Sequence, residues 1–133
     1  MAKAAFFLIL ALLPGHALAQ RPQAELACRH AGTDFVYDCV IRLKRAGQPL
    51  AGADILVGAD MPSMPMAHNV KPVKAKRGQA PGEYQARLDL EMQGEWAVKL
   101  RLSGPLRDQI VVNYVFDERG AQPVIRSGRS PRK

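Results

Sequence analysis

Three of the five methionines in this 133-residue chain, Met61, Met64 and Met66, lie within six residues of one another, and His68 follows two residues later. Prolines separate the methionines. Because proline fixes φ and is excluded from helices and central strands, we expect this loop to be extended. Side chains two residues apart in an extended chain project to the same side, about 6–7 Å apart. Met64, Met66 and His68 are therefore expected to form one row of donors.

This row of two thioethers and one imidazole suits a soft metal ion. Thioether sulfur is a weak ligand for hard and borderline cations but binds Cu(I) and, by the same softness, Ag(I). His68 must be neutral to bind a metal, so its contribution should weaken below about pH 6.5. Zinc is disfavoured, because the only other candidate donor in the loop is Asp60. A blue-copper site would need a cysteine thiolate and two histidines. An alternative stays open, in which the methionines form a hydrophobic lid, since methionine fills irregular gaps.

A second segment, Met92-Gln-Gly-Glu-Trp96, could contribute to the same site. We expect a three-residue connection here that leaves Met92 and Trp96 opposite each other, on the inward face near one end of the fold. Tryptophan is the best cation–π partner, so Trp96 with Met92 could cap a bound monovalent cation. In the alternative, Trp96 is the central tryptophan of the core.

The two cysteines, Cys28 and Cys39, are eleven residues apart, with turn-forming residues between them. A hairpin with a two-residue turn at Thr33 and Asp34 would place the cysteines directly opposite each other. In an oxidising compartment such a pair forms a disulfide, and we predict one here. The rival interpretation is a cysteine pair that binds metal as thiolates.

Period-two alternation of apolar and polar residues dominates the rest of the chain and predicts β-strands. Pro72 should confine its strand to a sheet edge. Turn residues separate the strands, and no helical period is convincing. We therefore predict an all-β fold, an Ig-like antiparallel β-sandwich of about seven strands. The expected strands are 24–30, 35–43, 53–58, 68–75, 83–92, 96–102 and 110–116.

The two ends of the chain are expected to lie outside this domain. Residues 1–19 resemble a secretory signal peptide, with Lys3, a short apolar stretch and an Ala-Leu-Ala cleavage site that ends at Ala19. Residues 126–133 carry four basic residues and no large apolar one, which predicts a disordered basic tail. The sandwich domain should span residues 20–125, and the protein should be periplasmic, without stable membrane insertion.

The net charge of +7 belongs mostly to these ends. Without Lys3 and the four basic residues of the tail, the 19 basic residues fall to 14, against 12 acidic ones. A nucleic-acid partner requires a basic face on the domain itself, so we expect no nucleic-acid binding. We also find no nucleophile elbow, no paired catalytic carboxylates and no three-ligand hydrolytic metal site, and we expect no enzymatic activity.

Four segments together resemble the YtkA-like/FixH-like family of small exported bacterial domains. They are Gly47-Gln-Pro-Leu-Ala-Gly-Ala53, Met61-Pro-Ser-Met-Pro-Met-Ala-His68, Pro81-Gly-Glu-Tyr84 and Met92-Gln-Gly-Glu-Trp96. The resemblance implies an Ig-like sandwich and an association with copper handling, in heavy-metal efflux or in cytochrome oxidase assembly. It also implies Met61, Met64, Met66 and His68 as the ligand set.

The sequence therefore predicts a periplasmic Cu(I)/Ag(I)-binding accessory protein, a chaperone or buffer. Its partners would be a copper ion and an envelope efflux or oxidase-assembly protein. The alternative is a metal-free interaction module that docks on such a complex by strand addition, with the methionines as an adaptable contact.

Overall fold

A computed structural model describes residues 20–66 and 69–125, and all regular secondary structure in these residues is β. The fold is an antiparallel β-sandwich, as predicted. All seven expected strands are present, with ends shifted by a few residues, and three short strands are added. The ten are β1 (Gln23–His30), β2 (Val36–Arg45), β3 (Gln48–Pro49), β4 (Asp54–Asp60), β5 (Asn69–Lys74), β6 (Lys76–Arg77), β7 (Glu83–Asp89), β8 (Gly94–Ser103), β9 (Asp108–Asp117) and β10 (Gly120–Pro123).

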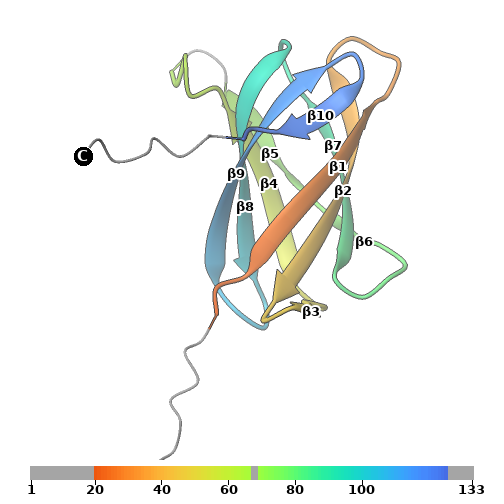
Figure 1. Ribbon diagram of the computed structural model, residues 1–133, viewed down its shortest axis with the longest axis vertical. Coiled ribbons are helices and arrows are strands. Elements are labelled where there is room, and N and C mark those ends of the chain that lie inside the picture. Colours follow the sequence, from red (N-terminus) through yellow and green to blue (C-terminus); the bar gives the residue numbers. More distant parts are fainter. Residues whose placement is uncertain (1–19, 67–68, 126–133) are drawn as a thin grey trace, which may run out of the picture.

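The strands form two sheets that face each other (Figure 1). The first sheet has the order β1-β2-β7-β6, and β3 pairs with β2. The second sheet, which carries the methionine loop, has the order β10-β9-β8-β4-β5. β5 is an edge strand, which confirms the expectation drawn from Pro72.

The core lies between the sheets and is built by the predicted alternation. Trp96, Val98, Leu100 and Leu102 of β8 point inward and are buried. They meet inward residues of the first sheet, among them Tyr37, whose ring lies edge-on to Phe116 with centroids 5.0 Å apart. Burial of this apolar surface is the main stabilising contribution to the fold.

Cys28 and Cys39 are directly opposite each other on β1 and β2, and a disulfide joins them. The predicted pairing and register are confirmed, but the tight turn lies one residue later than expected, because the N–H of Val36 donates to the carbonyl oxygen of Thr33 at 3.0 Å and Asp34 and Phe35 occupy the centre of the turn. The hairpin turn between the two strands contains Gly32 and Asp34 with positive φ, the backbone region that glycine and aspartate tolerate better than most residues.

The connection between β7 and β8 corrects one expectation. We expected a hairpin that leaves Met92 opposite Trp96, but β7 belongs to the first sheet and β8 to the second. Residues 90–93 therefore carry the chain across the end of the sandwich. A hairpin and a crossover leave the same sequence pattern here, because both strands turn one alternating face toward the same core.

The predicted signal peptide (residues 1–19), the predicted basic tail (residues 126–133) and His68 lie outside the described residues. Within the part of the chain that the structure describes, no helix is long and apolar enough to span a membrane.

Candidate metal centre

The methionine loop connects β4 to β5 and turns sharply where we expected it to be extended. The backbone N–H of Met64 donates to the carbonyl oxygen of Met61 at 3.1 Å. This bond closes a four-residue turn in which Pro62 holds the second position, where its fixed φ is favourable. A second turn follows at Pro65 and Met66. The expectation of an extended loop was wrong for residues 61–66, because proline supports a tight turn as readily as an extended chain, while His68, the third member of the expected row, lies outside the described residues.

The turn separates Met61 from the other two methionines. Met61 directly follows β4 and belongs to the hydrophobic core, with 5% of its surface exposed. Its Cε lies 3.2 Å from the point where a Cβ would stand on Gly94, so the absence of a side chain at Gly94 makes room for it. Met61 anchors the loop through this packing, as a buried member of the core.

Met64 and Met66 are the exposed members of the loop. Met64 is 38% exposed and Met66 is 91% exposed. Other large apolar side chains of this protein, such as Leu56 and Val111, are exposed to a similar degree, so what distinguishes the loop is that it carries two accessible thioethers on one short turn. The loop between β4 and β5 lies at the end of the sandwich that also carries the β7–β8 connection, at the top of Figure 1.

Trp96 is fully buried, and its indole N–H donates to the carbonyl oxygen of Met92 at 3.1 Å. The ring has no exposed face in this structure, and its role here is that of the central core tryptophan. Met92 is half-buried against the same core. The observed position of Trp96 therefore matches the alternative of a core residue, while Met92 retains some exposed surface.

Two polar groups at this end of the sandwich, Asp60 and His30, have partners already. Lys99 Nζ lies 2.6 Å from Asp60 Oδ2 and neutralises the carboxylate that precedes the loop. His30 Nδ1 accepts from the N–H of Gly32 at 3.0 Å, and the Nε2 of His30 is 2.6 Å from the carbonyl oxygen of Asp34. Nε2 is thus the protonated nitrogen, and neither ring nitrogen is left for a metal. Sequence reasoning missed the Asp60–Lys99 pair, which depends on the register of two strands.

No group of three or more histidine, cysteine, aspartate and glutamate side chains within residues 20–66 and 69–125 could hold a metal ion. Both cysteines are consumed by the disulfide. In the described loop, the accessible soft donors are the thioethers of Met64 and Met66.

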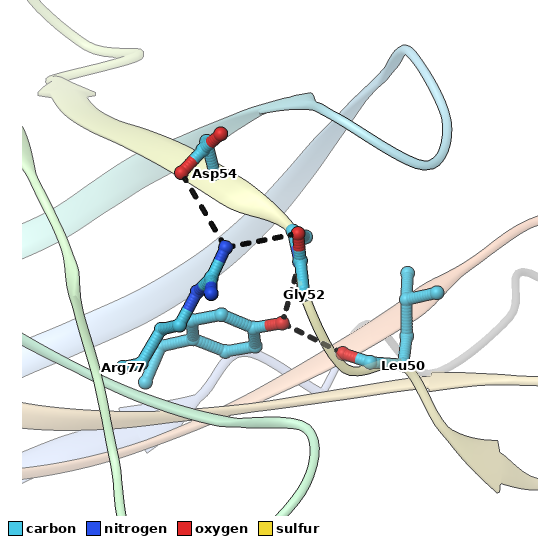
Figure 2. A network of polar contacts seen from close by, with 6 residues as sticks. Leu50, Gly52, Asp54 and Arg77 are labelled. Carbon is cyan, nitrogen blue, oxygen red and sulfur yellow. Dashed lines mark hydrogen bonds and ion pairs between the residues drawn. The ribbon is translucent and has the colours of Figure 1, made fainter.

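The far end of the sandwich is fixed by a polar network around the residues that precede β4 (Figure 2). Arg77 Nη2 donates to the carbonyl oxygen of Gly52 at 3.2 Å and lies 3.9 Å from Asp54 Oδ1. The buried hydroxyl of Tyr84 donates to the carbonyl oxygen of Leu50 at 2.7 Å and accepts from the N–H of Ala53 at 3.1 Å. This network positions the start of β4, the strand that ends at the methionine loop.

A model of the YtkA-like family matches residues 28–101. The chain belongs to the YtkA-like family. The matched region contains the methionine loop and all four sequence segments that carried the resemblance. No curated protein and no solved structure gives a significant match.

The geometry now separates the family segments into two groups. The segments around Leu50 and Tyr84 meet in the network at the far end, where they fix the fold. The segments around Met61 and Gly94 meet at the loop end, where packing of Met61 over Gly94 holds the two exposed thioethers in place. Within the described residues, only the second group brings exposed thioether sulfur to the surface.

Proposed function

We propose that this YtkA-like protein is an exported accessory protein that binds Cu(I), and by the same chemistry Ag(I), through the methionine loop. The supporting observation is that Met64 and Met66 are exposed together on a turn held by a buried methionine. Thioethers bind soft ions without losing a proton, and they do not form disulfides in an oxidising compartment.

The ligand set would be Met64 and Met66, joined by His68, which lies two residues beyond Met66 in the sequence. Met61 is held in the core and supports the loop from inside. The family resemblance also implied Met61 as a ligand, and that role requires the side chain to leave its packing against Gly94. Because the loop is open, one donor can be released at a time, which allows a chaperone or buffer to pass the ion on by ligand exchange.

The test is titration with Cu(I) in the presence of a colorimetric Cu(I) chelator, with ascorbate as the reductant so that the disulfide stays closed. The triple variant Met64→Ala/Met66→Ala/His68→Ala should bind Cu(I) at least roughly tenfold more weakly, about 1.4 kcal/mol. The control is Val111→Ala, which removes an exposed apolar side chain from β9 and leaves the loop and every sulfur in place. Equal affinity of the triple variant and the native protein would exclude this function.

The alternative, a metal-free interaction module, is supported by the same exposure, because methionine side chains adapt to an apolar partner surface. Strand addition at β5 is a less suitable route, since Pro72 lacks an N–H and a register shift interrupts the pairing between Val57 and Ala59. Capture of an envelope efflux or oxidase-assembly protein to the same extent with and without copper would favour this alternative.

A further inference from the structure

The outer face of the second sheet carries an apolar and basic groove at the end opposite the methionine loop. Four residues from four strands stand in one register row: Lys74 pairs with Leu56, Leu56 with Arg101, and Arg101 with Gln109. Leu56 is 44% exposed, so its side chain points away from the core and into solvent.

This row lies in a groove of about 740 Å³, which Arg107 and Asp108 also line. The row spans three interstrand spacings from β5 to β9, or roughly 14 Å. The two basic members of the row, Lys74 and Arg101, stand two of these spacings apart, or about 10 Å. A short peptide can follow the whole row, because an extended chain covers about 3.3 Å per residue.

The acidic residues of the groove are already paired with cations outside it. The carboxylate of Asp54 lies 3.9 Å from Arg77. The carboxylate of Asp108 accepts from the N–H of Gln109 at 2.7 Å and pairs with Arg21 at 3.3 Å.

Three basic side chains of the groove differ from these acidic residues in their ion pairing. Lys74, Arg101 and Arg107 have no ion-pair partner among the residues that the structure describes. The groove therefore presents three uncompensated positive charges around the exposed side chain of Leu56.

We propose that this groove binds an extended peptide segment of a partner protein that carries acidic residues and a leucine or a similar apolar residue. Carboxylates of the segment pair with Lys74, Arg101 and Arg107, and one apolar side chain covers Leu56. Charge complementarity supplies fast association and orientation, and burial of Leu56 adds an apolar contact. Because the groove is open to solvent, binding falls as salt is added. The site is independent of the methionine loop and of its metal chemistry.

The test uses a fluorescein-labelled hexapeptide of alternating glutamate and leucine, followed by fluorescence anisotropy at low ionic strength. The expected result is saturable binding that is lost in about 0.5 M salt, with amide chemical-shift changes at Leu56, Arg101 and Gln109. A lysine–leucine peptide should not bind. Binding of the acidic peptide elsewhere on the protein, or no binding, would overturn the proposal.

Two charge variants separate this groove from a general charge effect. Arg101→Gln/Arg107→Gln should weaken peptide binding at least roughly tenfold. Lys44→Gln/Lys76→Gln removes the same charge from exposed positions of the other sheet and should leave binding unchanged. Equal losses in both variants would show an unspecific electrostatic effect and refute the groove. Binding to anionic phospholipid vesicles without binding to the peptide would also refute it. The Met64→Ala/Met66→Ala/His68→Ala variant should bind the peptide normally, so the two proposals can fail separately.

Discussion

Gly120 at the start of β10 packs directly against the carbonyl oxygen of Cys28 on β1, with no room between them for a Cβ atom. The contact joins the edge strand of one sheet to the edge strand of the other. It closes this side of the sandwich next to the disulfide. On the opposite side the chain itself makes the closure, because β5 of the second sheet continues through Ala75 into β6 of the first.

Gly120→Ala should therefore destabilise the protein by about 2–4 kcal/mol, from overpacking and from the positive φ of 122° at this position. The measurement is urea denaturation followed by tryptophan fluorescence, with the midpoint compared at unchanged slope. Gly58→Ala is the matched control, since its Cβ would stand 3.8 Å from Pro72 Cγ, an ordinary contact. A Gly120→Ala midpoint equal to that of the control would show that the two edges can move apart freely.

Removal of the disulfide should weaken the same side of the fold. Cys28→Ala/Cys39→Ala should lower the free energy of unfolding by about 2–3 kcal/mol, because a closed loop of this length restricts the unfolded chain. Treatment of the native protein with a strong reductant should lower its free energy of unfolding by a similar amount in the same urea experiment. If neither treatment moves the midpoint, the cross-link contributes nothing to the stability of the hairpin.

Tyr84→Phe should lower the free energy of unfolding by about 1–3 kcal/mol. The hydroxyl of Tyr84 bridges the carbonyl oxygen of Leu50 and the N–H of Ala53, and its removal leaves both backbone groups without this partner. Hydrogen exchange should also become faster at Ala53, which reports the local network directly. Unchanged exchange and stability would mean that water replaces the hydroxyl without loss. Tyr114→Phe provides a comparison, because that hydroxyl accepts a single bond, from the N–H of Leu26.

Acid should weaken the first sheet through the ion pair of Asp38 with Arg87. Arg87 donates to both carboxylate oxygens of Asp38, at 2.8 and 3.2 Å, and these hydrogen bonds lower the pKa of Asp38 below its ordinary value. Since the folded pKa is lower than the unfolded one, the pair stabilises the protein above about pH 4. That contribution is lost as the pH falls through the folded pKa.

The measurement is the urea midpoint at about pH 7 and about pH 3 for the native protein and for Arg87→Gln. The native protein should lose more stability on acidification than the variant. The pKa values of Asp108 and Asp117 are also lowered, by the backbone N–H of Gln109 and by the side chain of Arg119 respectively, so both proteins keep some acid sensitivity. Equal losses of stability in the native protein and in Arg87→Gln would show that the Asp38–Arg87 pair does not contribute to the acid sensitivity.

The strands and the disulfide could be predicted because each depends on a local pattern. A strand with one buried face alternates visibly over six or more residues, and the turn between Cys28 and Cys39 fixes the register of its own hairpin. The short strands β3, β6 and β10 were missed, because two to four residues are too few to show a period.

The candidate site was harder to predict, because its geometry depends on choices that the pattern leaves open. Proline at position 62 is compatible with an extended chain and with a turn, and only the Met61–Met64 hydrogen bond decides between them. The crossover at Met92 was mistaken for a hairpin, since the inward faces of β7 and β8 alternate identically in either topology. The groove around Leu56 requires the register of four strands, which the sequence does not reveal.

The same substitution at Met61 and at Met66 should have opposite effects, because one side chain is buried and the other is exposed. Met61→Leu should reduce stability by less than about 1.5 kcal/mol, as volume-conserving core changes do, and should leave Cu(I) affinity almost unchanged. Met66→Leu should leave stability unchanged and weaken Cu(I) binding, since leucine keeps the apolar bulk but has no sulfur. Chelator competition gives the Cu(I) affinity of each variant, and urea denaturation gives its stability. If Met61→Leu weakens Cu(I) binding more than Met66→Leu does, the ion is held by the inner sulfur, and the exposed loop acts as its cover.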